Sequence, residues 1–234
     1  MRLVSYNVLA AAYVRPEFYR GCAPAALEPR ARLAAVLERI HGLSDGPSII
    51  CLQEAERELV DALGCQCEFF QKSQNKPDGC AILVNHPGSY HWSRFHYGDG
   101  SGHGALLLHL PNLTVATTHI KWDPPESRPG YGMGQIKELL QKIQSPAVLC
   151  GDFNCESLDP IVVACREAGF LDPFEEVSPN QTFVKEGQAR RIDFLLHTRE
   201  LKLRGVPMPD HRPGAWLPSG KQPSDHFPLV AYLD

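Results

Sequence analysis

Carboxylate, amide and imidazole side chains interrupt or border several apolar runs of this sequence. Taken singly, each has an ordinary reading, such as a turn cap, a helix start or a hydrogen-bonded core histidine. As a set, these side chains are not well explained by such ordinary roles, because burying unpaired charges costs several kcal/mol apiece. A positive partner is therefore expected among them. The residues are Asn7, Glu54, His119, Asp152, Asn154, Asp193, Asp225 and His226.

The chemistry that fits this set is phosphoester hydrolysis with a hard divalent cation. Carboxylate and amide oxygens suit Mg²⁺, for which Mn²⁺ can substitute, and the sequence lacks the clustered Cys and His ligands of catalytic zinc. Such a cation neutralises charge on the phosphate, an imidazole stabilises the developing oxyanion, and a carboxylate takes a proton from the attacking water.

Apolar runs of strand length dominate the chain, and helical spacing occurs in only a few segments. Many strands with a minority of helices, not strictly alternating, predict two sheets packed face to face with helices outside. The long Pro- and Gly-containing connections 11–28, 123–132 and 207–224 are expected to be loops on one body. Strands are expected at 2–9, 48–54, 67–72, 80–86, 90–95, 105–110, 113–120, 147–154, 191–197 and 227–233, and helices at 30–40, 56–64, 134–143 and 159–168.

Length and charge limit the organisation of the protein. With 234 residues and 43% hydrophobic content, we expect a single catalytic domain over residues 1–234. The net charge of −4 gives no global positive field for collecting nucleic acid. A polyanionic substrate must therefore be held locally, by a metal and a few basic side chains.

The cysteines do not suggest a disulfide framework. The eight are scattered, and several lie in apolar runs where cysteine behaves as a small buried hydrophobe. Cys65 and Cys67 lack a second pair at zinc-ribbon spacing, so structural zinc is disfavoured. The first strand-like run begins at Arg2, which leaves no room for a signal peptide, and no apolar stretch has membrane-spanning length. We expect a reducing, cytoplasmic location and no membrane partner.

Ordered motifs carry a resemblance to a known family. YN, CLQE, TTHIKWDP, GDFN, RIDF and SDHFPL occur in the order found in the endonuclease/exonuclease/phosphatase superfamily, which the whole chain resembles. PDGCAILV and HIKWDP are similar to segments of its deadenylase, nocturnin and angel subgroup. The resemblance implies a four-layer α/β sandwich, with two packed mixed β-sheets flanked by helices and the site at one edge.

The resemblance also implies roles for residues of the metal environment. Glu54 in CLQE would be the principal metal ligand, Asn7 in YN would help to hold the metal or the phosphate, and Asp225 would complete the metal environment. Asp152 would orient or deprotonate the attacking water, and Asn154 would bind the scissile phosphate or the nucleophile. Whether one or two ions bind stays open.

Two histidines complete the implied catalytic set. His226 would contact a phosphate oxygen, with Asp193 fixing its tautomer and orientation. His119 would stabilise the pentacovalent transition state. All three lie in the quoted motifs SDH, RIDF and TTH.

Substrate contacts are implied by the loop after His119. Deadenylases place the proline of HxxWDP beside the terminal adenine, and Pro124 matches it here. They also place an aromatic residue shortly before the aspartate of their IDY motif, whereas here Phe183 lies farther back. Ordinary readings stay open, since loop anchors and solvated surface charges are common. The substrate-binding candidates are Lys121, Trp122, Pro124, Arg128, Arg190 and Arg191.

The leading functional expectation is a deadenylase-like 3′–5′ exoribonuclease acting on RNA 3′ ends. The alternative within the fold is an end-phosphatase for a 2′-phosphate or a 2′,3′-cyclic phosphate of RNA or a nucleotide. A DNA repair endonuclease is disfavoured by the PDGCAILV and HIKWDP segments. A non-enzymatic binding module is disfavoured because Glu54, Asp152 and His226 are all present. The leucine-rich recruitment repeats of large deadenylases are absent, and a monomer is expected.

Overall fold

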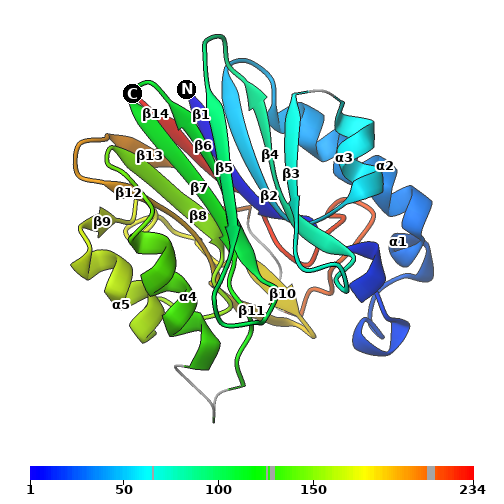
Figure 1. Cartoon of the computed structure of the whole chain (residues 1–234). Helices are drawn as coiled ribbons and strands as arrows, with labels where there is room; N and C mark the ends of the chain where they lie inside the picture. Colours follow the sequence, from blue (N-terminus) through cyan, green and yellow to red (C-terminus); the bar gives the residue numbers. More distant parts are fainter. Residues whose placement is uncertain (65, 125, 127–129, 210–213) are drawn as a thin grey trace.

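Two six-stranded mixed sheets form the centre of the molecule (Figure 1). The computed structural model describes residues 1–64, 66–124, 126, 130–209 and 214–234. The first sheet has the order β13-β14-β1-β2-β4-β3 and the second β5-β6-β7-β8-β12-β9. The first comprises β1 (Arg2–Asn7), β2 (Ser48–Glu56), β3 (Cys67–Gln71), β4 (Asp78–Asn85), β13 (Leu203–Gly205) and β14 (Leu229–Leu233). The second comprises β5 (His91–His96), β6 (Gly104–Leu110), β7 (Leu113–His119), β8 (Ala147–Asp152), β9 (Phe170–Leu171) and β12 (Asp193–Thr198).

Helices cover the outer face of each sheet, which makes four layers (Figure 1). Along β2, Ile49 and Cys51 face the second sheet, whereas Ile50 and Leu52 pack with the helices outside. Successive strand residues point to opposite faces, so a strand buried on both faces needs an unbroken apolar run. The predicted α/β sandwich is confirmed. Its helices are α1 (Pro24–Leu27), α2 (Pro29–Leu43), α3 (Arg57–Leu63), α4 (Gly130–Leu140) and α5 (Pro160–Glu167).

Helix α2 links two segments that reach the site. Pro29 opens the helix, and the Glu28 side chain caps it by accepting a hydrogen bond from the Ala31 N–H. One turn later, the buried guanidinium of Arg32 donates to the carbonyls of Leu9, after β1, and of Pro223, before β14. Arg32 thus holds together the chain segments that carry Asn7 and Asp225.

The expected strands and helices are found, with differences at some ends and in polar segments. Helix α4 begins at Gly130 and ends at Leu140, earlier on both sides than 134–143. The connection 11–28 contains α1 and two 3₁₀ turns, Ala11–Tyr13 and Pro16–Phe18. Strands β9 and β13 and the hairpin of β10 (Phe183–Lys185) and β11 (Gln188–Arg190) have too few residues for a periodic pattern. Among the described helices, none is long and apolar enough to cross a membrane.

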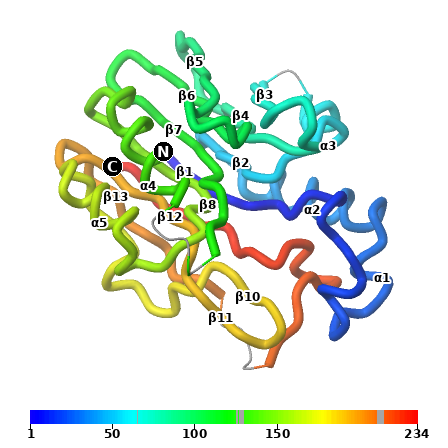
Figure 2. The backbone as a smooth tube through the Cα atoms, turned by 60° about the horizontal axis from the view of Figure 1, so that its bottom comes forward, coloured from blue at the N-terminus to red at the C-terminus, as the bar shows by residue number. Residues whose placement is uncertain are grey.

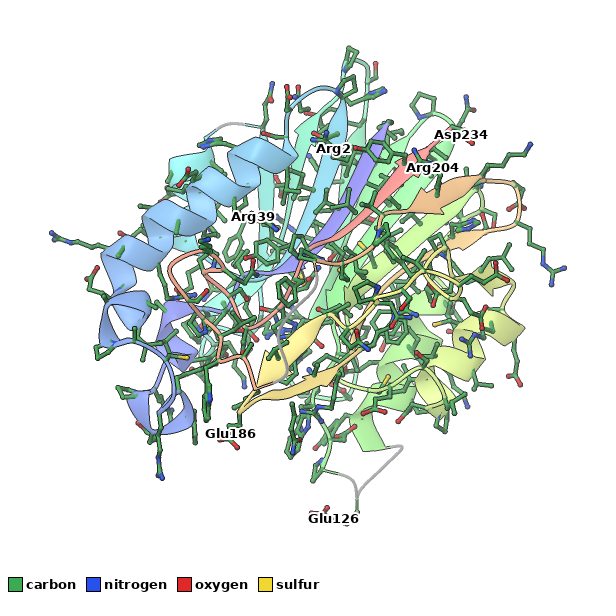
Figure 3. All side chains as sticks on the ribbon, turned by 180° about the vertical axis from the view of Figure 1, so that it is seen from behind. Arg2, Arg39, Glu126, Glu186, Arg204 and Asp234 are labelled. Carbon is green, nitrogen blue, oxygen red and sulfur yellow. The ribbon has the colours of Figure 1, made fainter. Side chains whose placement is uncertain are left out.

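Polar strand ends meet at one edge of the sandwich. His119 at the end of β7 and Asp193 at the start of β12 both pair with Asp152 at the end of β8. In Figure 2, which brings this end forward, the chain before β14 runs between the hairpin β10–β11 and the segment around α1. Figure 3 labels Glu186 at the tip of that hairpin and Asp234 at the opposite end of the molecule.

Candidate active site

A cleft of about 640 Å³ lies at this edge and gathers most of the predicted catalytic side chains. Trp122 and Arg190 also line it, together with residues from the connection 11–28 and from the hairpin. Asn7 and Asp193 are buried and contact the lining side chains from behind. The predicted catalytic and metal residues on the wall are Glu54, His119, Asp152, Asn154, Asp225 and His226.

An irregularity in β2 places Glu54 on the wall. The pairing of β2 with β4 shifts between Leu52 and Ala55, and Glu54 has a φ of 55°. That left-handed conformation costs on the order of 1–3 kcal/mol for a residue with a side chain, and such strain is concentrated at functional sites. The Glu54 carboxylate accepts from Asn7 Nδ2 (3.1 Å) and from the Ala10 N–H (3.0 Å).

Asp152 stands at the centre of the site. Its Oδ1 accepts from the Asn154 backbone N–H at 2.8 Å, and its Oδ2 accepts from Asn7 Nδ2 at 2.9 Å. Oδ2 also lies 3.7 Å from His119 Nε2 and 3.8 Å from His226 Nε2. The carboxylate is thus fixed between two imidazoles and two amides.

Asn7 presents its amide nitrogen, and not its oxygen, to the two carboxylates. Its Oδ1 accepts from the Leu9 N–H at 2.9 Å, which fixes the orientation of the amide. In this arrangement Asn7 joins Glu54 to Asp152 through hydrogen bonds. Direct ligation of a metal by Asn7 stays a prediction.

His226 forms a buried ion pair with Asp193. Nδ1 of the ring lies 2.8 Å from Asp193 Oδ2, which leaves Nε2 facing Asp152. Burial alone lowers the pKa of His226, but the charge of Asp193, the hydrogen bond to it and the charges of Asp225 and Asp152 raise that pKa to about 10. The imidazole is therefore cationic at neutral pH.

The remaining carboxylates favour a bound cation. Burial raises the pKa of Glu54, and burial together with the charge of Asp193 raises the pKa of Asp152 to about 7. Oδ1 of Asp193 and Oδ1 of Asp225 are buried without a hydrogen-bond partner among the described residues. Crowded carboxylates with orphaned oxygens are the environment that a divalent cation stabilises.

Two triads have ligand atoms that all lie within 4.8 Å of one another, so each could hold a metal ion. One is Glu54, His119 and Asp152, and the other is Asp152, Asp193 and His226. The second contains the ion pair of His226, and an imidazolium has no lone pair for a metal. The carboxylates of the first triad, with the nearby Asp225, are the better donors. Oxygen donors suit Mg²⁺ or Mn²⁺.

Several residues of the site were not predicted from the sequence. Lys72 Nζ lies 3.2 Å from His119 Nδ1 and 2.6 Å from Asp78 Oδ2. The hydroxyl of Tyr13 donates to Asp78 Oδ1 at 2.7 Å, and that of Tyr19 donates to Asp225 Oδ2 at 2.9 Å. The sequence did single out the segment PDGCAILV, which contains Asp78, but as a family motif and not as a side-chain contact.

The predicted substrate-binding residues separate into two groups. Trp122 and Arg190 line the cleft, and Trp122 is 55% exposed. Lys121 has its ammonium 3.4 Å from the centroid of the Tyr131 ring, and Arg191 forms an ion pair with Asp172 in which Nη2 donates to both carboxylate oxygens. Pro124 is half-buried and does not line the cleft, and Arg128 lies outside the described residues.

The rim of the cleft carries further aromatic and basic groups. Phe18 is exposed, and the ammonium of Lys185 lies 5.1 Å from its ring centroid. Arg15 also lines the cleft. Phe183 is buried and packs on His226 with 4.8 Å between the ring centroids, so it belongs to the wall and supports the imidazole.

The site combines carboxylates, amides and paired imidazoles at one edge of two packed sheets. This combination defines a phosphoester hydrolase of the two-sheet class. Residues 4–226 match the Endonuclease/Exonuclease/phosphatase family. The chain belongs to this family, as the motifs of the sequence predicted.

Individual relatives agree with the predicted subgroup. "Protein angel homolog 2" of Danio rerio is 28% identical over 196 residues, which cover 68% of this chain and 34% of that protein. The "CCR4-Not complex 3'-5'-exoribonuclease subunit Ccr4" of Kluyveromyces lactis is 24% identical, covering 99% of this chain and 41% of that protein. The chain therefore spans well under half the length of these relatives.

A solved structure has the same fold. ANGEL2, described as a 2',3'-cyclic phosphatase in complex with adenosine-2',3'-vanadate, superposes with a TM-score of 0.75 at 22% identity. The match covers 98% of this chain and 94% of that chain. At this identity the similarity establishes the fold.

Proposed function

We propose that this protein is a Mg²⁺-dependent phosphoesterase acting on the 3′ ends of RNA, with a deadenylase-like 3′–5′ exoribonuclease as the leading activity. The observation that carries the proposal is the position of Asp152, whose Oδ2 lies between the Nε2 atoms of His119 and His226 at 3.7 and 3.8 Å. A proton acceptor flanked by two imidazoles, beside crowded carboxylates, suits attack of water on a phosphate.

Mg²⁺ would be held by oxygens of Glu54, Asp225 and Asp152, where it would neutralise charge on the phosphate and act as a Lewis acid. The orphaned Oδ1 of Asp225 and the raised pKa of Glu54 support this donor set.

The protein's own groups supply the proton chemistry. Asp152, which lies between two imidazoles and is held by Asn7 and the Asn154 N–H, is placed to take a proton from an attacking water. The cationic His226 donates a hydrogen bond from Nε2 to a phosphate oxygen, while Asp193 holds the opposite nitrogen. Asn154 fixes Asp152 through its backbone N–H, which keeps the acceptor oriented during attack.

The composition of the rim supports a nucleotide end as substrate. Exposed Phe18 and Trp122 offer ring faces on which bases can stack, and Arg15, Lys185 and Arg190 supply positive charge for a few phosphates. The overall charge of −4 favours such local capture over binding along a long polyanion. The family relatives that include a 3′–5′ exoribonuclease support the leading activity.

A second candidate is hydrolysis of a 2′,3′-cyclic phosphate at an RNA or nucleotide end. The structural similarity to ANGEL2, described as a 2′,3′-cyclic phosphatase, supports this alternative. The burial of Phe183 also favours it, because that ring packs on His226 and does not form the exposed half of an adenine clamp.

Labelled RNA oligonucleotides distinguish the two activities. The protein is incubated in Mg²⁺ with 5′-labelled RNAs that end in a 3′-hydroxyl, a 2′-phosphate or a 2′,3′-cyclic phosphate. A ladder of shortened products identifies the exonuclease, and an unchanged length with an altered end identifies the end-phosphatase. Asp152→Asn, at the centre of the site, serves as the inactive control. Release of nitrophenol from bis-(nitrophenyl) phosphate tests the broader proposal, which fails if Mg²⁺ and Mn²⁺ both give no turnover.

A further inference from the structure

We infer that Lys72 is a positioning residue that sets the tautomer of His119, so that the ring presents an Nε2–H donor to the cleft. The ammonium of Lys72 lies 3.2 Å from His119 Nδ1, and both side chains are buried. The catalytic consequence of this tautomer rests on the proposed function, whereas the assignment of the tautomer does not depend on it.

The first step follows from hydrogen-bond types. A lysine ammonium has three donors and no acceptor. At 3.2 Å it therefore requires a lone pair on Nδ1 of His119, and a neutral imidazole with that lone pair carries its proton on Nε2. Because the Lys72 side chain is only 6% exposed, water does not readily replace this contact.

The second step is the anchoring of Lys72. Its Nζ forms an ion pair at 2.6 Å with Oδ2 of Asp78, which is fully buried, and Tyr13 donates to the other oxygen of that carboxylate at 2.7 Å. His103 Nδ1 lies 2.9 Å from the backbone carbonyl of His119 and fixes the backbone of that residue. A chain of contacts therefore runs from Tyr13 on the cleft wall to the imidazole.

The third step concerns the cleft side of the ring. His119 Nε2 lies 3.0 Å from Asn154 Nδ2, which also donates to the Ile120 carbonyl at 2.9 Å. An amide N–H can bond to Nε2 only if that nitrogen carries a lone pair, so the Asn154 contact competes with the Lys72 contact for the tautomer. The buried ammonium is the stronger donor, because a hydrogen bond from a charged group exceeds one from a neutral amide, and it favours the proton on Nε2. The Nε2–H can then donate to an oxygen in the cleft, as to a phosphate oxygen during attack. Lys72 therefore prepares a donor for that oxygen.

Nitrogen NMR tests the tautomer without any activity measurement. The protein is labelled with ¹⁵N-histidine and kept free of metal, and the His119 signals are assigned by their loss in His119→Gln. The expected long-range ¹H–¹⁵N pattern shows Nε2 protonated and Nδ1 unprotonated. A wild-type pattern with the proton on Nδ1 overturns the inference, and this result requires no folded variant of Lys72.

Variants of Lys72 test its causal role. Lys72→Met should give a mixture of tautomers, whereas Lys76→Met, which removes an equal charge from the same turn, should keep the wild-type pattern. Since Lys72→Met leaves the buried Asp78 carboxylate without its cationic partner, Lys72→Met/Asp78→Asn is measured as well. An unchanged tautomer in either folded Lys72 variant contradicts the role.

Kinetics provide the catalytic readout. With bis-(nitrophenyl) phosphate, kcat of the folded double variant should fall roughly ten- to a hundredfold, as for other groups that orient a catalytic side chain, while KM changes little. A folded double variant with wild-type kcat overturns the catalytic consequence. A wild-type protein with no turnover refutes the proposed function instead, and the NMR result then still decides the tautomer.

Discussion

In the proposed function Glu54 is the principal metal ligand, and its surroundings suit that role. Its left-handed backbone at the irregularity of β2 brings the carboxylate to the cleft, where Asn7 and the Ala10 N–H hold it. The strained backbone and the desolvation of the carboxylate, which raises the pKa of Glu54, both reduce stability when no cation is bound. A bound cation would offset both effects, because it would attract the Glu54 carboxylate and reduce its repulsion with the neighbouring carboxylates.

Replacing Glu54 with Ala should therefore separate metal binding from folding. We expect the Mg²⁺ concentration for half-maximal activity to rise and the rate to fall by orders of magnitude, while the metal-free protein melts no earlier than the wild type. A Mg²⁺ titration of nitrophenol release and thermal unfolding measure the two effects. Glu58→Ala on the exposed face of α3 is the control. Unchanged metal dependence would contradict the assignment of Glu54.

The ion pair of His226 and Asp193 predicts the alkaline limb of the pH–rate profile. With a pKa of about 10, His226 stays protonated through neutral pH. Asp193→Asn removes the charge that raises this pKa, so the alkaline limb should move to lower pH and the maximal rate should fall. The stability from this pair should be fully present below a pH of about 6.5, the unperturbed histidine pKa, and should be lost as the pH rises toward 10.

A double-mutant cycle tests whether the two residues act as a unit. His226→Ala should cost more activity than Asp193→Asn because it deletes the proposed phosphate contact itself. The double variant should be hardly worse than His226→Ala alone. Additive losses in kcat/KM would mean that Asp193 acts elsewhere, most simply on the metal.

At the scale of elements, the sequence predicts best the strands that are buried on both faces. Runs such as SIICLQE leave no exposed face, so their length and composition identify them. The hairpin β10–β11 is short and polar, and it forms by pairing with itself and through a bridge from Phe183 to His226. Nothing in its local pattern indicates that pairing, because it depends on tertiary neighbours.

The same limit explains which site residues were predicted. Asn7 and Asp152 end their strands and Glu54 lies near the end of β2, so each polar group contrasts with the apolar run before it. Lys72, which pairs with Asp78, contacts His119 only because the turn between β3 and β4 and the end of β7 belong to opposing sheets. A lysine in a polar turn resembles any solvated lysine, so its burial could not be predicted from the sequence.

Gly151, the residue before Asp152, allows β7 and β8 to approach each other closely beside the site. Its φ is 148°, and a Cβ there would lie 1.9 Å from the Thr118 carbonyl oxygen on β7. Gly151→Ala should therefore lower the free energy of unfolding by about 2–4 kcal/mol, through strain and separation of β7 from β8. Gly134→Ala in α4, where a Cβ meets nothing within 4 Å, should instead be neutral or stabilising by up to about 1 kcal/mol. Urea unfolding compares them, and equal effects would contradict this account.

Substitutions of the exposed aromatic residues on the rim should raise KM for RNA but not for small substrates. Phe18→Ala and Trp122→Ala should each raise KM for a short RNA by roughly tenfold, since base stacking on an aromatic ring contributes about 1–3 kcal/mol. KM for bis-(nitrophenyl) phosphate should hardly change, because that substrate has no base. Tyr90→Ala, an exposed aromatic that does not line the cleft, is the control. Parallel losses on both substrates would indicate a structural role.

At the scale of the whole molecule, the charge distribution predicts a weak dependence on salt. The net charge is −4, and Arg15, Lys185 and Arg190 are the basic residues on the described wall of the cleft. Each phosphate contact to a single strand contributes about −0.7 to the slope of log affinity against log salt, so three contacts give a slope of roughly −2. Binding of a short RNA to Asp152→Asn across a salt series measures this slope. A much steeper slope would require a broader basic surface than the cleft provides.

The pairing of β1 with β14 has a topological consequence. The amino group of Met1 donates to the Leu233 carbonyl at 2.8 Å, so the backbone traces a nearly closed circuit (Figure 1). Asn7 and His226 lie one strand away from these two ends, at the far side of the sandwich. A short peptide joining residues 1 and 234 would close the ring without crossing the cleft, and new ends opened at the exposed turn around Gly88 would lie outside it too. The candidate site thus depends on the arrangement of strands and not on a starting point along the chain, so a polypeptide of residues 1–234 is suited to circular permutation.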